Sequence, residues 1–347
     1  YRGIEIKEYE DEAKKRTEEE LIDYRVVREG QLVVNTMWLN YAGLGVSDFE
    51  GHVSPAYRSY WMDKSLDGRF IHNLLRSSCY VAGYTKYMQG IRPNSLQINT
   101  DDFACFPVLL PPFHEQTQIA AFLDRETAKI DRLIAKQEEL IALLGEKRQA
   151  VISHAVTKGL HPGVPMRDSG VEWLGEIPAH WEVSPLRRYL KKLEQGWSPE
   201  AANTPSQEGE KGVLKLSAVK NGRFLPQENK TLDSGLDLEK GLFLKCGDLL
   251  LTRANTPTLV GDACVVRDVQ EGTLMLCDLV YRLSLETTLV EEYLCYWLIS
   301  SFGRVQIIMD ARGSSMTMAK ISQEHIKAWL LPIPPRKEQR ALITHII

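Results

Sequence analysis

The sequence has no long apolar run and no paired cysteines. Its longest apolar stretches, such as Leu140 to Leu144, fall far short of the ~20 residues that span a bilayer, and no apolar signal segment lies near the start. The six cysteines include no C-x-x-C pair, so their spacing indicates neither a zinc site nor a disulfide framework. We therefore expect a cytoplasmic protein with no membrane association and with reduced, mostly buried thiols.

Motifs of covalent chemistry are absent as well. The chain has no G-x-x-x-x-G-K-[ST] phosphate loop, no G-x-G-x-x-G turn, no H-E-x-x-H metal pair and no G-x-S-x-G elbow. It also lacks the Asp/Asn-Pro-Pro-Tyr/Phe run that adenine methyltransferases use at their target base. The eight histidines are spread without ligand spacing. We expect no catalytic, cofactor-binding or metal-ligating residue, and hence a chain that is not an enzyme.

The sequence has no excess of basic charge either. Over 347 residues, 42 Lys and Arg stand against 46 Asp and Glu, which gives a formal net charge of -4. The length and composition are those of a globular protein of roughly two domains. This balance argues against nucleic-acid binding through bulk electrostatics alone. Any such binding has to come from local patches or from partner chains.

What the chain does contain is an internal repeat. Leu110-Pro-Pro-Phe-His-Glu-Gln116 recurs as Ile333-Pro-Pro-Arg-Lys-Glu-Gln339, and Gly30-Gln-Leu-Val-Val-Asn-Thr36 resembles Gly247-Asp-Leu-Leu-Leu-Thr-Arg253. We infer two copies of one unit. The first residue is Tyr1 rather than Met, and Ile347 stands inside an apolar pattern that has just begun, so we expect the chain to be truncated at both ends.

A long helix is predicted between the two copies. Pro111-Pro112 predicts its start, because proline fixes φ and lacks the N–H that a first turn leaves unpaired. From Glu115 to about Lys158 there is no proline, and Gly159 and Pro162 end the helix. Apolar residues spaced by threes and fours form one stripe that we expect to contact a partner: Ile119, Leu123, Ile130, Leu133, Ile134, Leu140, Ile141 and Leu144.

The opposite face of this helix carries mixed charges. We therefore favour a coiled-coil type spacer over a helix buried across the core of one large domain. The helix that starts at Glu338 would supply the partner for the stripe.

The rest of the second copy indicates an α+β fold. Residues 164–181 are rich in Gly, Pro and Trp and predict an ordered linker. Apolar and β-branched runs predict strands within 212–219, 241–251, 262–266 and 274–285, and residues 290–309 resemble one amphipathic helix.

These motifs together resemble the DNA specificity subunit of type I restriction-modification enzymes. The resemblance is carried by the repeated Pro-Pro-x-x-Glu-Gln helix start and by Pro165-Met-Arg-Asp-Ser-Gly-Val-Glu-Trp-Leu-Gly-Glu-Ile-Pro-Ala-His-Trp-Glu-Val183. Gly247 to Arg253, Val260-Gly261 and Arg312-Gly-Ser-Ser-Met316 also look like that family's target recognition domains. The resemblance covers essentially the whole chain.

The resemblance implies an architecture. It gives a first target recognition domain at 1–109 with its N-terminal part missing, a central spacer helix at 110–160, a second recognition domain at 161–331 and the truncated start of a second spacer helix at 332–347. Each domain would read one half of a split double-stranded DNA site, and the helices would set the gap between the halves.

The resemblance also implies partners and their cofactors. Two adenine methyltransferase subunits would carry S-adenosylmethionine, and restriction subunits that translocate DNA would use ATP and Mg. The part of the apolar stripe that the helix starting at Glu338 leaves uncovered is the expected docking site for the methyltransferases.

Loops after strands are the expected DNA-contact residues, because Arg pairs bidentately with guanine and Asn with adenine in the major groove. In copy two the candidates are Trp197, Ser198, Lys220, Asn221, Arg223, Arg253, Asn255, Thr256, Arg312, Ser314 and Ser315. In copy one they are Asn35, Thr36, Trp38, Asn40, Lys86, Tyr87 and Arg92. Trp173 and Trp181 belong to the linker signature and are expected to anchor it rather than to stack on bases.

Two rival functions remain open from the sequence. A protein–protein scaffold would use the repeat to bracket two identical partners and would be indifferent to loss of Arg253, Asn255 or Arg312. A stand-alone nuclease is disfavoured, because no metal-binding carboxylate cluster stands out.

Overall fold

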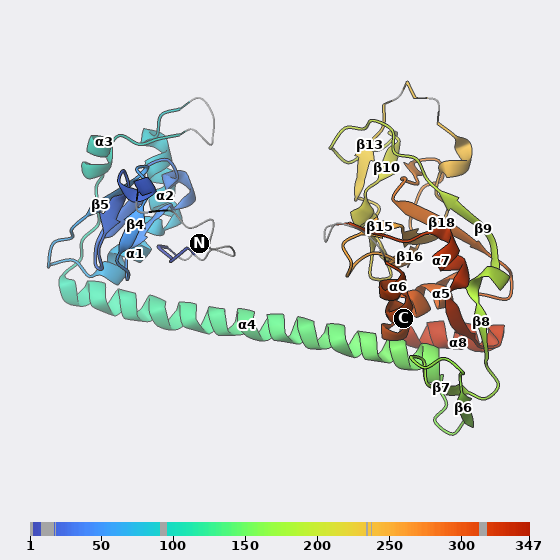
Figure 1. The fold of residues 1–347 in the computed structure, drawn as a ribbon. Coiled ribbons are helices and arrows are strands. Elements are labelled where there is room, and N and C mark those ends of the chain that lie inside the picture. The colour runs from blue at the N-terminus through green and yellow to red at the C-terminus, as the bar shows by residue number, and fades with distance from the viewer. Residues whose placement is uncertain are drawn as a thin grey trace. The chain divides into compact units, whose positions relative to one another are not determined.

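The computed structural model describes residues 3–7, 17, 19–90, 96–233, 235–236, 238–311 and 318–347. The chain divides into two compact units, residues 1–138 and 139–347. One helix of 46 residues, α4 (Phe113–Lys158), begins in the first unit and ends in the second (Figure 1). The predicted helix over 115–158 and the α+β class are confirmed.

The first unit is built on a three-stranded antiparallel sheet in which β2 lies between β3 and β5. All four side chains of β2 are buried, and α1 and α2 pack against the same core through residues such as Phe70 and Tyr84. The described elements before α4 are η2 (Glu19–Leu21), β1 (Arg25–Val27), β2 (Leu32–Asn35), η3 (Leu39–Tyr41), β3 (Leu44–Val46), β4 (Gly51–Val53), β5 (Tyr57–Tyr60), α1 (Gly68–Arg76), α2 (Ser78–Tyr87) and α3 (Thr100–Ala104).

The second unit has a central antiparallel sheet of order β16-β14-β18-β9 and a smaller sheet of order β13-β10-β17. Its described elements are β6 (Met166–Asp168), β7 (Glu176–Pro178), β8 (Glu182–Pro185), η5 (Leu186–Arg188), β9 (Leu190–Gln195), β10 (Gly212–Leu214), η6 (Leu216–Ala218), β11 (Val219–Lys220), β12 (Arg223–Phe224), β13 (Asn229–Thr231), η7 (Lys240–Leu242), β14 (Leu249–Thr252), β15 (Ala254–Asn255), β16 (Ala263–Val265), β17 (Leu274–Met275), β18 (Val280–Leu285), α5 (Glu291–Ile299), α6 (Ser301–Asp310), β19 (Ala319–Lys320), α7 (Gln323–Ala328), β20 (Leu330–Ile333) and α8 (Arg336–Ile346).

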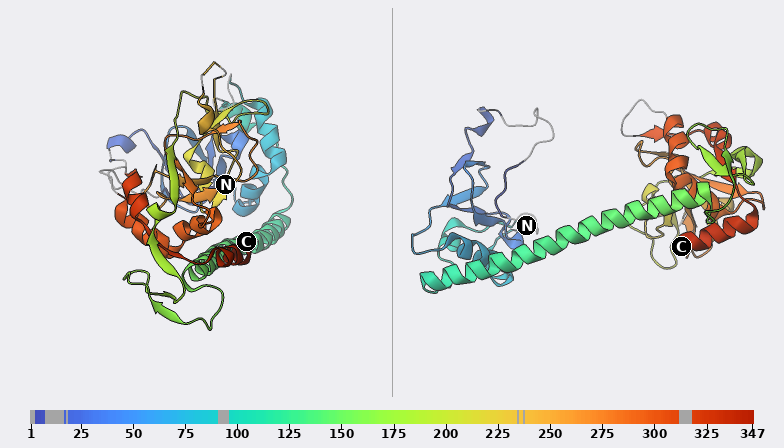
Figure 2. Two further views of the ribbon diagram at one scale, coloured as in Figure 1. Left: turned by 90° about the vertical axis from the view of Figure 1, so that its right-hand side faces the viewer. Right: turned by 90° about the horizontal axis from the view of Figure 1, so that it is seen from below.

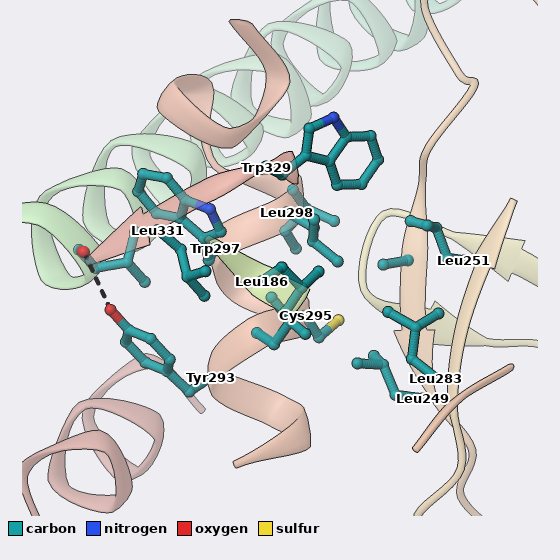
Figure 3. Close-up of a cluster of buried hydrophobic side chains, with 14 of the residues drawn as sticks. Leu186, Leu249, Leu251, Leu283, Tyr293, Cys295, Trp297, Leu298, Trp329 and Leu331 are labelled. Carbon is teal, nitrogen blue, oxygen red and sulfur yellow. Dashed lines mark hydrogen bonds between the residues drawn. The ribbon is translucent and has the colours of Figure 1, made fainter. Parts of the chain in front are cut away.

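The central sheet separates two hydrophobic cores. Successive strand residues point to opposite faces, so Leu249 and Leu251 of β14 enter the first core and Leu250 enters the second. The first core also takes α5 and the end of α4, and it holds the fully buried Trp297 and Trp329 (Figure 3). The sheet is therefore apolar on both faces, as the continuous apolar runs of the sequence indicate.

The predicted repeat is visible in the order of the elements. The sheet β3-β2-β5 of the first unit corresponds to β16-β14-β18 of the second, and in both units three helices follow in the same order. α1, α2 and α3 correspond to α5, α6 and α7, and α4 and α8 then begin at the repeated Pro-Pro pairs.

A buried glutamine fixes the start of α4. The Gln116 side-chain oxygen accepts a hydrogen bond from the Asp67 N–H at 3.0 Å. Its amide nitrogen donates to the carbonyls of Ser65 and Pro111 at 3.3 and 2.8 Å. The helix start is thus tied to the loop that precedes α1.

Gln339 repeats this arrangement at the start of α8. Its side-chain oxygen accepts a hydrogen bond from the Val290 N–H at 2.9 Å, and its amide nitrogen donates to the carbonyls of Thr288 and Pro334 at 3.0 and 2.9 Å. Each backbone partner occupies the corresponding position of its copy. The repeat therefore extends to single hydrogen bonds.

α8 runs antiparallel to the last turns of α4 within the second unit (Figure 2). Glu338, near the start of α8, lies beside Gly159 at the end of α4. His345 and Ile346, at the other end of α8, line hollows with the α4 segment 144–155. α8 thus lies against the last turns of α4.

The expected spacer segments 110–160 and 332–347 do not stand apart from the two units. Ala120 of α4 lies in the core of the first unit, whereas Ile152 and Val156 of α4 and Leu342 of α8 lie in the core of the second. The division between the two compact units falls inside α4, after Glu138.

Three predictions about local structure need correction. Residues 290–309 form two helices, because Ser300 takes an extended conformation and its hydroxyl caps α6 by accepting the Gly303 N–H. The run 241–251 is strand only from Leu249, and the linker 164–181 contains the short β6–β7 hairpin.

The prediction that the thiols are mostly buried is only half right. Cys264, Cys277 and Cys295 are buried, whereas Cys79, Cys105 and Cys246 are exposed. Burial raises the pKa of the Cys277 thiol to about 11.

Candidate nucleic-acid interface

Three loops leave the same edge of the central sheet. The strand register pairs Thr252 with Val280 and Tyr281 with Gln195, and the β14–β16 connection begins after Thr252. The end of β9, the end of β14 and the start of β18 therefore lie together. The segments 196–198, 253–262 and 276–279 form one loop face, which we call the reading edge.

Trp197 and Ser198 are held on the reading edge by the segment before β18. The Ser198 hydroxyl hydrogen-bonds the Asp278 carboxylate and accepts the Asp278 N–H at 3.1 Å, and the Trp197 N–H donates to the Leu276 carbonyl at 3.1 Å. The Trp197 side chain remains 45% exposed. A fixed loop thus presents a large aromatic surface to solvent.

Arg253 lies next to this loop. Its N–H donates to the Leu279 carbonyl at 2.8 Å, and its guanidinium carbon lies 6.0 Å from the centre of the Tyr281 ring. Asn255 follows in β15, where its side-chain oxygen accepts the Thr256 N–H at 2.8 Å. The amide nitrogen of Asn255 has no protein partner within the described residues and can still donate.

Lys220 and Arg223 flank a tight hairpin between β11 and β12. Its central residues, Asn221 and Gly222, have φ of +46° and +78°, which is the pattern of a type I′ turn. The Gly222 N–H donates to the Ala263 carbonyl at 2.9 Å, so the hairpin lies against the first residue of β16.

Asp262 clamps this hairpin to the reading edge. Its carboxylate accepts the N–H of Asn221 at 2.6 Å and that of Ala263 at 2.8 Å, and the Asp262 N–H donates to Thr252 Oγ1 at 2.9 Å. Burial raises the pKa of Asp262, although these hydrogen bonds and the nearby Arg304 oppose the shift. Sequence reasoning missed Asp262, because nothing distinguishes a clamping aspartate from one that faces solvent.

Arg304 of α6 supports the same loop. Its guanidinium donates to the Val260 and Thr258 carbonyls at 2.6 and 3.0 Å, and burial lowers the pKa of Arg304. Arg304 thus binds two carbonyls of the 253–262 loop, while Asn255 and Thr256 remain at least partly accessible to solvent.

The first unit has an equivalent edge with different side chains. The Ile98 N–H donates to the Thr36 carbonyl at 3.1 Å, as the Ile321 N–H does to the Arg253 carbonyl at 3.0 Å. Thr36 therefore stands where the second unit has Arg253.

Two candidates of the first unit are almost completely buried. Asn35 is 8% exposed and Thr36 4%. The Asn35 side-chain oxygen accepts the Met37 N–H, and the Thr36 hydroxyl donates to the Ala56 carbonyl. The Asn35 side chain thus closes its own turn, and the Thr36 hydroxyl ties this turn to the segment before β5.

Trp38 remains available on this edge. It is 52% exposed, and its ring centre lies 5.4 Å from that of Tyr41. Both rings line a hollow of about 310 Å³ with Tyr57 and Arg76. Asn40 is partly buried, and its side-chain oxygen has no partner in the described part of the chain.

Lys86 and Tyr87 are exposed at the end of α2, where the Tyr87 ring packs edge-on against Phe106 at 5.6 Å. The remaining candidates lie outside the described residues: Arg92, Arg312, Ser314 and Ser315.

The linker tryptophans are structural, as expected. Trp181 is 1% exposed in the first core of the second unit, and the ring centre of Trp173 lies 6.3 Å from that of Trp297.

The apolar stripe of α4 is exposed along the middle of the helix. Ile119 and Leu123 are partly buried, whereas the other members are 46–69% exposed: Ile130, Leu133, Ile134, Leu140, Ile141 and Leu144. Within the described ranges, no helix is long and apolar enough to cross a bilayer. The same residues hold no group of three or more His, Cys, Asp or Glu side chains placed to bind a metal ion.

Comparison with known proteins finds two similar curated proteins. The type I restriction enzyme EcoKI specificity subunit of Escherichia coli strain K12 is 26% identical over 291 residues, which cover 82% of this chain and 59% of that protein. The EcoEI specificity subunit of Escherichia coli is 27% identical over 210 residues, which cover 60% of this chain and 35% of that protein. This chain thus spans well under two thirds of these relatives. No family model matches it.

A solved structure shares the fold. A chain from a structure concerned with complex assembly and conformational transition of the type I R-M system superposes with a TM-score of 0.62. The match covers 94% of this chain and 75% of that chain at 18% identity. The resemblance to type I specificity subunits and the repeated α+β fold with its long helix are confirmed.

Proposed function

We propose that this chain is the DNA-reading part of a type I specificity subunit, in which each unit reads one half of a split double-stranded DNA site. The observation that carries the proposal is the repeat: both units share the same element order and the same glutamine hydrogen bonds, yet they differ in the side chains of the reading edge. Two units that share one fold but carry different loop residues suit a protein that recognises two different half-sites.

The second unit supplies the chemistry for base recognition. The guanidinium of Arg253 suits guanine and the amide of Asn255 suits adenine, each at about 1–3 kcal/mol of discrimination. The contact set in this unit comprises Trp197, Ser198, Lys220, Asn221, Arg223, Arg253, Asn255 and Thr256. In the first unit, Trp38, Lys86 and Tyr87 are the accessible candidates.

Catalysis would belong to partner chains. We assign methylation to two adenine methyltransferase subunits with S-adenosylmethionine, and cleavage to restriction subunits that use ATP and Mg. The methyltransferases would dock on the exposed stripe of α4 beyond the segment that α8 covers. Partners would also supply much of the phosphate neutralisation that a chain of net charge -4 does not provide by itself.

The proposal is tested by co-expressing the full-length subunit with its methyltransferase and sequencing the methylated adenines on random DNA. We expect a two-part motif with a fixed unspecified gap. A stable complex without any methylation would contradict the proposal and favour a scaffold that brackets two identical partners.

A further inference from the structure

A hollow of about 440 Å³ in the second unit is lined by three arginines from three separate elements. Arg148 lies on α4, Arg223 on β12, and Arg267 follows β16. Asp268 and Glu292 are the acidic residues of the lining. The hollow is thus a locally basic site in a chain whose net charge is -4.

The guanidinium groups of this hollow are largely unpaired. Within the described residues, the side chains of Arg148 and Arg223 make no hydrogen bond or ion pair with another protein group. Arg267 approaches Glu292 only at 3.9 Å, with 55% of the Arg267 side chain exposed. Arg148 is partly buried, and its guanidinium remains able to donate hydrogen bonds to an anion that enters the hollow.

Asp268 and Glu292 offset two of the three arginine charges, so one positive charge of the lining is left over. Burial raises the pKa of the Cys295 thiol to about 12, so the thiol stays neutral at physiological pH. A guanidinium offers planar paired donors that match the oxygens of a phosphate. A tetrahedral oxyanion is therefore the ligand that this set of side chains would bind best.

The position of the hollow favours a phosphate of DNA over an acidic segment of a partner protein. Arg223 belongs to the same hairpin as Lys220 and Asn221, and Asp262 clamps that hairpin to the reading edge. A Cβ added to Gly222 would lie 3.5 Å from an Arg148 nitrogen, so the Arg148 side chain lies beside the turn. An anion in the hollow would therefore contact the same hairpin that carries Lys220 and Asn221.

We propose that Arg148, Arg223 and Arg267 form a subsite for one DNA backbone phosphate beside the half-site read by the second unit. This inference rests on the proposed function. Phosphate contacts fix the register of a protein on the duplex, whereas base contacts specify the sequence. The subsite would set where the reading edge meets the bases without choosing them.

The test compares Arg148→Gln and Arg267→Gln with the wild-type subunit in its methyltransferase complex. Affinity for a duplex carrying the methylated motif, and for one with a scrambled half-site, is measured over a range of salt concentrations. Losing one phosphate contact should lower the slope of log K against log salt by about 0.9 and weaken binding to both duplexes by the same factor. The methylated motif should not change.

Two further variants sharpen the test. Arg188→Gln removes one exposed arginine that pairs with Glu182 outside the hollow, and it should leave the salt slope unchanged. Glu292→Gln removes an opposing carboxylate from the lining, and it should tighten binding to both duplexes. This gain cannot come from a misfolded variant.

Several results would overturn the inference. If the Arg148 and Arg267 variants keep the wild-type affinity and slope, the hollow binds no phosphate. If DNA binding is normal but the methyltransferase dissociates, the hollow accepts an acidic partner surface instead. A wild-type complex without any sequence preference would overturn the proposed function itself.

Discussion

Gln116 and Gln339 show how much a single buried side chain can organise. Each makes three hydrogen bonds at the start of a helix, two of them to the loop before α1 or α5, and each is at most 2% exposed. Deleting such a group leaves buried backbone partners unsatisfied, at about 1–3 kcal/mol for each group.

Gln339→Ala should therefore destabilise the second unit by about 2–4 kcal/mol, because the Val290 N–H and the Thr288 carbonyl lose their partner. Urea unfolding measures the loss. Gln137→Ala, on the exposed surface of α4, should change stability by less than about 0.5 kcal/mol. Equal effects of the two variants would contradict this account.

Single residues were the hardest level to predict from sequence. The repeat identified Gln116 and Gln339 as equivalent, but it did not show that they are buried. Asn35 and Thr36 are predicted to contact DNA, and the structure shows both side chains hydrogen-bonded to the backbone, Asn35 to Met37 and Thr36 to Ala56. A polar residue after a strand has the same sequence signature whether it faces solvent or its own backbone, and only the tertiary fold decides.

At the scale of elements, α4 is the feature that the sequence predicted best. Its start and end follow from local chemistry, because the two prolines open it and a glycine with φ of +75° ends it. The break between α5 and α6 was not predicted. Apolar spacing continues across Ser300, so it does not reveal that the Ser300 backbone is extended and ends α5. Gly303 follows at a position where a Cβ would clash with the Trp297 carbonyl.

The cap of α1 gives a pH-dependent prediction. Burial raises the pKa of Asp67, but hydrogen bonds from Phe70, Thr117 and Arg69 outweigh it, so the pKa lies below its ordinary value of 3.8. The ionised cap therefore stabilises the fold above pH 3.8, and this contribution disappears as pH falls through the lowered pKa.

Asp67→Ala should accordingly cost about 1 kcal/mol at neutral pH and progressively less in acid. Denaturant titrations of wild type and variant at several pH values measure the difference. Asp67→Asn keeps a capping oxygen and should lose much less at neutral pH. A stability gap that stays constant down to acid pH would rule out the ionised cap as its source.

The exposed stripe of α4 gives a prediction about assembly. Ile141 is 69% exposed, so Ile141→Glu should leave the unfolding free energy within about 0.5 kcal/mol of wild type. If the stripe is an interface, the same change should weaken association with the methyltransferase by placing a charge in an apolar contact. Analytical ultracentrifugation measures the free subunit and the subunit bound to the methyltransferase, and urea unfolding measures the stability of the variant.

Lys136→Glu, elsewhere on the middle of α4, serves as the control. Association that survives Ile141→Glu as well as it survives Lys136→Glu would show that the stripe is not the docking surface.

At the scale of the whole molecule, the sequence predicted the fold class, the repeat and the long helix. It did not predict the Asp262 clamp or the arginine hollow, because both join residues that are far apart in the chain. Local patterns specify elements, whereas a site assembled from several loops becomes visible only when the strand register brings those loops to one edge.

The central claim is that each unit reads its own half-site. The most direct test is the methylation motif of two variants, Arg253→Ala with Asn255→Ala in the second unit and Trp38→Ala with Lys86→Ala in the first. We predict that each pair changes or relaxes one half of the motif, a different half for each pair, and leaves the gap and the other half intact. Unchanged motifs in both variants, or changes in both halves from either one, would contradict the account.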